Sequence, residues 1–246
     1  MKTYHTDPPP MQRALSRMLT ELTFQDEVSG VILFGSVQTG RIGPGSDIDL
    51  LIVTDGHEYW REGKMVLGIP FDLFFNPVSK LLERFHDEDA VMLQAAATGD
   101  VLYDRHQTME HIVQAARRLW SKGPSRLSQW NEILLRYRIG SLAQDLKFAP
   151  ERDPQTLMLS MFVVQSSLEG YLTLHQHWPV PVKHLLERID KLDPALGQDA
   201  RRFFSAMPDK ELALYIADKV IEPFGGRVTH YSIPKERMTE RGQEGP

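Results

Sequence analysis

Short apolar runs separated by turn residues fill the first half of the chain. Val28–Phe34 is an almost unbroken apolar run, and Asp47–Val53 is a second one that follows a loop rich in glycine and proline. Runs of this length between glycine and proline are typical of buried strands. Lys64–Gly68 and Pro70–Phe75 predict a further strand or hairpin, and Val101–Tyr103 predicts a short strand. This half of the chain therefore predicts a small sheet.

Apolar residues at helical spacing predict helices around these strands and throughout the second half. The sequence Ser121–Ser125 contains a Gly-Pro pair flanked by serines, which indicates a linker. The predicted helices before the linker are Met11–Leu22, Pro77–Phe85, Asp89–Ala97 and Met109–Trp120, and those after it are Leu127–Phe148, Thr156–His175, Val182–Leu192, Pro194–Ala206 and Lys210–Ile221.

These elements predict an α+β protein with two domains. A small mixed-sheet domain should occupy residues 1–122, and an all-α helical bundle should occupy residues 123–226. Residues 227–246 are rich in charged residues and glycine, so we expect a mobile tail there.

Composition narrows the class of protein. The chain has 246 residues, 41% apolar and 25% charged, and no cysteine, which excludes disulfides and thiol catalysis. No run reaches the roughly 20 apolar residues that span a membrane, and the first residues lack the apolar core of a secretory signal. We therefore expect a cytoplasmic protein that does not bind membranes.

Charge is unevenly distributed along the chain. The formal net charge is −5, which argues against a general nucleic-acid binder. Residues 1–120 hold 11 basic and 17 acidic residues, whereas residues 121–246 hold 17 basic and 16 acidic ones. The first half is thus the acidic one.

Three carboxylates interrupt the apolar runs of the predicted sheet. Asp47 and Asp49 are two residues apart on one predicted strand, so their side chains should point to the same face. Asp72 lies within another apolar run, where an uncompensated charge would be costly. Hard carboxylate oxygens suit Mg²⁺, which commonly takes one or two carboxylates together with substrate phosphates. The turn at Gly35 and Ser36 offers backbone N–H groups and a hydroxyl to a phosphate.

The order of these motifs resembles a known signature. Gly35-Ser36, ten intervening residues, Asp47-Ile48-Asp49-Leu50 and then Phe71-Asp72-Leu73 are similar to the signature of the DNA polymerase beta type of nucleotidyltransferase. The small branch of that superfamily includes the kanamycin, streptomycin and spectinomycin nucleotidyltransferases and the minimal nucleotidyltransferases. The resemblance covers residues 30–105 well and the helical remainder loosely.

The resemblance implies a reaction and roles for these residues. The reaction is transfer of a nucleoside monophosphate, with AMP from ATP as the expected case, to a hydroxyl of an acceptor. By resemblance, Asp47 and Asp49 bind the metals that bridge the triphosphate, with two Mg²⁺ ions expected, and Gly35 and Ser36 contact its phosphates. Asp72 either shares the second metal or takes the proton from the attacking hydroxyl.

Candidates in the helical half are weaker. Lys183 follows a Trp-Pro-containing loop, and the helical domains of similar proteins often carry such a loop followed by a lysine. Lys183 is therefore expected either to reach a phosphate or to be a solvated lysine at a helix start. Arg136 and Arg138 either line the cleft or lie at the surface with buried stems. Glu169 either orients an acceptor or is a solvated acid on a helix face.

Three functions compete. The first is a Mg²⁺-dependent enzyme that modifies a small hydroxylated acceptor, an aminoglycoside-like antibiotic being one case. The second is an antitoxin-like or protein-modifying adenylyltransferase. The third is a nucleotide-binding regulator without turnover. A homodimer that completes the cleft would resemble kanamycin nucleotidyltransferase.

Overall fold

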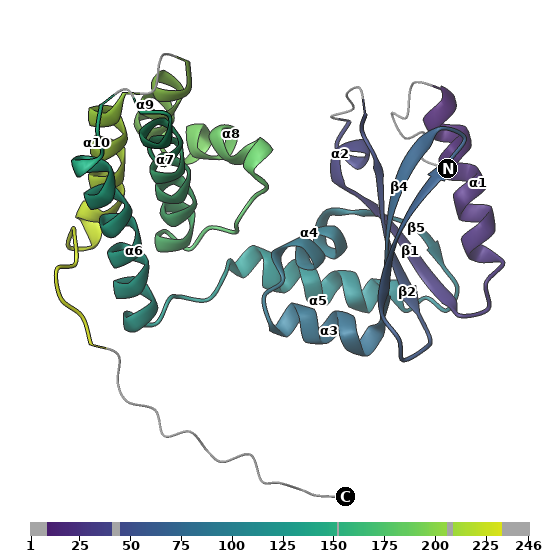
Figure 1. Ribbon diagram of the computed structural model, residues 1–246. Helices are drawn as coiled ribbons and strands as arrows, with labels where there is room; N and C mark the ends of the chain where they lie inside the picture. Colours follow the sequence, from purple (N-terminus) through teal and green to yellow (C-terminus); the bar gives the residue numbers. More distant parts are fainter. Residues whose placement is uncertain (1–8, 41–44, 152, 206–208, 233–246) are drawn as a thin grey trace, which may run out of the picture. The chain divides into compact units, whose positions relative to one another are not determined.

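In the computed structural model the chain divides into two structural units, with the boundary between Ser125 and Arg126 (Figure 1). The structure describes residues 9–40, 45–151, 153–205 and 209–232. The first unit holds a mixed five-stranded sheet, and the second is helical. The α+β class predicted from the sequence is therefore confirmed.

The sheet has the strand order β3-β4-β2-β1-β5. Its neighbouring strands pair antiparallel, except for β2 and β4, which run parallel. The strands are β1 (Val28–Phe34), β2 (Ile48–Thr54), β3 (Trp60–Val66), β4 (Ile69–Pro77) and β5 (Asp100–Asp104). Because β2 and β4 are parallel, both begin at the same end of the sheet.

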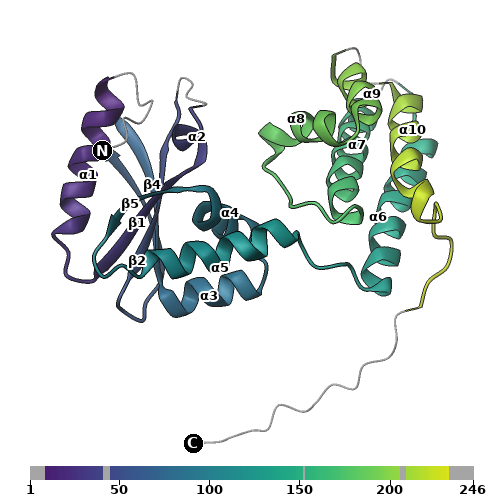
Figure 2. The ribbon, with the colours of Figure 1, turned by 180° about the vertical axis from the view of Figure 1, so that it is seen from behind.

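Helices cover both faces of this sheet. Figures 1 and 2 show α1 (Pro9–Thr23) on one face and α3 (Val78–His86), α4 (Ala90–Thr98) and α5 (Met109–Lys122) on the other. Alternate residues of β2 and β4, such as Leu50 and Leu73, pack in one cluster with α1. Full burial of each such leucine contributes about 1.5–3 kcal/mol. The intervening residues point to the opposite face.

A two-residue turn joins β3 to β4 and fixes how they pair. Leu67 and Gly68 both have positive φ, 50° and 78°, as the central residues of a type I′ hairpin turn do. The turn places Val66 opposite Ile69 and, further along, Gly63 opposite Asp72. The residues of β3 that face the start of β4 are therefore set by this turn.

The second unit is built from α6 (Gln129–Phe148), α7 (Pro154–Leu174), α8 (Val182–Leu192), α9 (Pro194–Ser205), α10 (Lys210–Ile221) and the short 3-10 helix η1 (Glu222–Phe224). Asp153 caps α7 by accepting a hydrogen bond from the Gln155 N–H, 2.7 Å away. Buried residues of α6 to α10, including Ile139, Leu168 and Ile216, form one core.

Helix α7 is long and apolar. By length and composition alone it could cross a membrane, and within the described residues no other helix meets that test. Of its most apolar window, 56% is buried inside the unit, as expected for the central helix of a bundle. This helix by itself is weak support for a membrane segment.

Contacts of the second unit continue past Gly226. Arg227 forms a two-fold hydrogen bond with Asp218 of α10, and the Tyr231 ring lies 4.6 Å from the Tyr137 ring of α6. Residues 227–232 thus pack on the helices. The remainder of the expected tail, 233–246, lies outside the described residues.

Candidate active site

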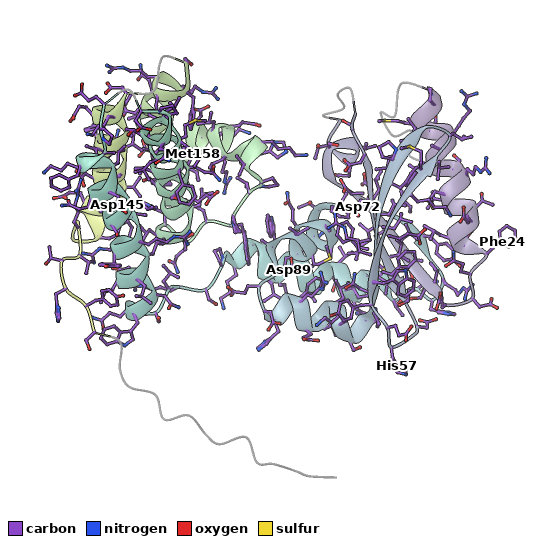
Figure 3. All side chains as sticks on the ribbon, viewed as in Figure 1. Phe24, His57, Asp72, Asp89, Asp145 and Met158 are labelled. Carbon is purple, nitrogen blue, oxygen red and sulfur yellow. The ribbon has the colours of Figure 1, made fainter. Side chains whose placement is uncertain are left out.

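The pairing of β2 with β4 brings two of the predicted acids together. In this parallel pair Asp49 is the direct partner of Asp72, so their side chains are neighbours on one face. Asp47 directly precedes β2, two residues before Asp49. Figure 3 shows Asp72 on the side of the sheet away from α1. All three acids are half-buried, at the end of the sheet where β2 and β4 begin.

The Gly35 turn touches the second of these acids. Phe34 pairs with Asp49 across β1 and β2, and Gly35 then leaves the strand with a φ of 79° to enter α2 (Gly35–Gln38). A Cβ atom at position 35 would lie 2.1 Å from Oδ2 of Asp49. The backbone of the turn and the carboxylate are therefore in direct contact, which only glycine permits.

The turn after Gly35 is closed by its own hydrogen bonds. The hydroxyl of Thr39 donates to the carbonyl oxygens of Gly35, at 3.2 Å, and of Ser36, at 3.1 Å. Ser36 itself is half-buried at the start of α2. Of the two residues predicted to meet phosphates, Gly35 thus lies beside Asp49, and Ser36 directly follows Gly35.

An arginine that the sequence did not suggest completes the group. Arg61 of β3 donates from Nε to Oδ1 of Asp72 at 2.7 Å, and its Nη2 donates to the other carboxylate oxygen. The guanidinium lies over the Phe74 ring, 4.6 Å from its centre, and Phe74 in turn contacts Phe34. Arg61 is thus held by a carboxylate on one side and an aromatic face on the other.

The electrostatics of Arg61 link it to all three acids. The hydrogen bonds that Arg61 donates to Asp72 raise the pKa of the Arg61 guanidinium, against a smaller effect of burial, and the charges of Asp72, Asp49 and Asp47 raise it further. One cation therefore interacts with three carboxylates, which would otherwise repel one another.

The metal-binding roles predicted for Asp47, Asp49 and Asp72 stay predictions. Among the residues that the structure describes, no three histidine, cysteine, aspartate or glutamate side chains converge to hold a metal ion. In the structure both carboxylate oxygens of Asp72 accept hydrogen bonds from Arg61. The donor set still fits Mg²⁺, because Asp49 and Asp72 are adjacent hard-oxygen donors that already face a cation.

The candidates of the helical half lie in the second unit. Lys183 is exposed in the first turn of α8, within the second unit, so its predicted phosphate contact stays a prediction. Arg136 donates to the Gly226 carbonyl oxygen and lies 3.7 Å from Glu132, which is a structural role. Glu169 is exposed and accepts a hydrogen bond from the Gln165 amide, as a solvated helix-face acid does.

A surface hollow of about 520 Å³ lies in the second unit, whereas the three carboxylates belong to the first unit. It is lined by Trp130, Ile133, Arg136 and residues 227–232. No acid lines it, so it supplies no carboxylate ligands of the kind that Mg²⁺ takes. A smaller hollow is lined by residues 57–60, and Figure 3 shows His57 at the far end of the first unit from Asp72. Neither hollow marks the predicted site.

Comparison with known proteins assigns the class of the first unit. Residues 15–93 match the family described as "Nucleotidyltransferase domain", a range that contains Gly35, Ser36 and all three acids. The first unit therefore matches a nucleotidyltransferase domain, in agreement with the resemblance seen in the sequence.

Other comparisons add little. Among solved structures, the nucleotidyltransferase-like protein from Exiguobacterium sibiricum 255-15 is 12% identical, with a TM-score of 0.46 over 87% of this chain and 75% of that one. No curated protein matches the chain. The domain supports nucleotidyl transfer as the general activity.

Sequence reasoning missed Arg61 because it placed the strand too late. The predicted strand began at Lys64, whereas β3 begins at Trp60. A signal was present: counting back from a two-residue turn at Leu67-Gly68 puts Arg61 opposite Phe74, on the face of Asp72.

Proposed function

We propose that the protein is a Mg²⁺-dependent nucleotidyltransferase that moves a nucleoside monophosphate, AMP from ATP, to a hydroxyl of a small acceptor. The observation that carries this proposal is the position of Asp49, in contact with the Gly35 turn on one side and paired with Asp72 on the other. A phosphate-binding turn and adjacent carboxylates are the two parts that a metal–triphosphate complex needs.

In this proposal, different residues of the chain bind the metal ions and the phosphates. Asp47 and Asp49 provide oxygen ligands for the cations that accompany the triphosphate. The backbone of the Gly35 turn and the hydroxyl of Ser36 hold phosphate oxygens. Bound Mg²⁺ would neutralise the charge that builds on the phosphoryl oxygens and on the leaving pyrophosphate.

Asp72 has two roles open to it. As a ligand it would share a cation with Asp49, its neighbour in the sheet. As a general base it would accept the proton of the attacking acceptor hydroxyl on a carboxylate oxygen. Both roles require oxygens that Arg61 now occupies.

The proposed acceptor is a small polyhydroxylated cation of the aminoglycoside kind. Support comes from the excess of acidic residues in the first half of the chain, 17 against 11 basic ones in residues 1–120, since an acidic surface attracts polycations. The choice of ATP rests on the resemblance to the small branch of the superfamily.

The test is pyrophosphate release by the full chain with Mg²⁺, each of the four nucleoside triphosphates, and a panel of aminoglycosides. We expect release with ATP and a positively charged acceptor, and none for Asp49→Ala. Modification of a protein substrate instead would favour the antitoxin-like function. Triphosphate binding without pyrophosphate from any acceptor would reject an enzyme and favour a regulator.

A further inference from the structure

The Arg61–Asp72 pair places a protein cation where the proposed function requires a metal. We propose that Arg61 is a built-in counter-ion of the carboxylate site, which competes with divalent metal for Asp72 and is released when metal binds. This inference rests on the proposed function, since it assumes that metal binds at these acids.

The register between β3 and β4 places Arg61 within reach of Asp72. Gly63 is the residue directly opposite Asp72, and nothing lies within 4 Å of where its Cβ atom would be. The flank of Asp72 on β3 is therefore open, and Arg61, two residues away on the same face, reaches across to fill it.

The two partners of the pair are unequally exposed. The Arg61 side chain is 65% exposed, whereas that of Asp72 is 18% exposed. The Arg61 guanidinium can thus leave Asp72 and form hydrogen bonds with water instead, with little change in its solvation. The Asp72 carboxylate stays in the site. An exposed ion pair of this kind is weak enough to be displaced by a divalent ion.

Phe74 keeps the released cation near the site. The guanidinium stacks on the Phe74 ring, and this contact does not depend on Asp72. After metal binding, a positive charge would therefore remain beside the incoming triphosphate. Metal and nucleotide should consequently bind better together than either does alone.

Lys64 on the same strand provides a matched comparison. It pairs with Phe71 in the hairpin, so it lies on the opposite face of the sheet, where it forms an ion pair with Glu21 of α1. Lys64→Ala removes the same charge from the same strand without touching Asp72.

The experiment measures Mn²⁺ affinity of the full chain without nucleotide, from the electron paramagnetic resonance signal of free Mn²⁺. We expect Arg61→Ala to bind Mn²⁺ about two- to five-fold more tightly than the wild type, the range that an exposed ion pair allows. Lys64→Ala should bind like the wild type. Arg61→Gln, which keeps length without charge, gives the same test if Arg61→Ala folds poorly.

A double-mutant cycle separates this pair from a general charge effect. In an Asp72→Asn background, Arg61→Ala should no longer tighten binding. Unchanged or weaker Mn²⁺ binding by both Arg61 variants, or equal tightening in the Asp72→Asn background, overturns the inference alone. A wild type that binds no Mn²⁺, or binds it equally after Asp49→Ala, overturns the proposed function as well.

Discussion

Gly35 lies so close to Asp49 that a methyl group at position 35 would stand 2.1 Å from the Asp49 carboxylate. Gly35→Ala should therefore displace the carboxylate or the turn, and we expect turnover to fall by about 100-fold or more, as misplaced catalytic groups do. Steady-state pyrophosphate release measures the effect.

Gly40→Ala is the control for backbone strain. Gly40 has a φ of 73°, close to the 79° of Gly35, but nothing lies within 4 Å of its Cβ position. Both variants should lose about 1–2 kcal/mol of stability from the left-handed conformation. Equal turnover of the two variants would show that the contact with Asp49 is unimportant.

Removal of Asp47 or Asp49 should disable metal and triphosphate binding together. We expect Asp47→Ala and Asp49→Ala to lower turnover by about 100- to 1,000-fold, since each removes charge stabilisation at the reacting phosphate. Calorimetric titration with ATP and Mg²⁺ should show lost binding. Asp55→Asn, an exposed acid just past the other end of β2, should behave like the wild type.

Asp72→Asn tests the role of the third acid. If Asp72 accepts the proton of the acceptor, triphosphate binding should persist while turnover falls by about 100-fold or more. A loss of Mg²⁺-dependent triphosphate binding equal to the loss of turnover would assign Asp72 as chiefly a metal ligand. The two measurements on one variant therefore separate the two roles.

Ser36→Ala should have a modest effect. If Ser36 holds a phosphate as proposed, the variant loses one hydroxyl contact worth about 1 kcal/mol, so the Michaelis constant for the triphosphate should rise about five-fold with little change in the turnover number. Ser121→Ala, at an exposed serine of α5, is the control. A large fall in turnover number at an unchanged Michaelis constant would contradict simple phosphate binding.

Acid should destabilise the helical unit through His177. Burial lowers the pKa of His177, and the nearby Arg188 and His175 lower it further. A histidine whose pKa is lower in the folded state favours folding above its unfolded pKa of about 6.5, and that stability is lost as pH falls through the folded pKa. The melting temperature should therefore drop between pH 7.5 and pH 5.5.

His177→Gln should reduce this pH dependence, whereas His57→Gln, an exposed histidine of the first unit, should leave it unchanged. Thermal melts of the three proteins at both pH values make the comparison. An identical pH dependence in wild type and His177→Gln would assign the effect to other groups.

The regular parts of the fold follow from sequence patterns. The predicted strand Val28–Phe34 and the predicted helices Val182–Leu192 and Lys210–Ile221 have the observed bounds, because long apolar or periodic runs specify burial directly. The edge strand β3 was placed too late. Its first residues include the exposed Arg61, Glu62 and Gly63, which give no apolar alternation.

The candidate site was predictable only in part. Alternation along a strand indicated that Asp47 and Asp49 share a face, but sequence gives no register between distant strands, and the pairing of Asp49 with Asp72 came from the structure. The guanidinium at Asp72 was missed for the same reason, since it depends on which residue of β3 meets which residue of β4.

The hairpin turn at Leu67 and Gly68 has a consequence for how the site could diversify. An inserted residue there would slide β3 past β4 and exchange the side chains that face Asp72, while β2, β4 and the acids stayed in place. If metal binds as proposed, a change in a surface loop would then alter the metal affinity of the site and leave Asp47, Asp49 and Asp72 intact.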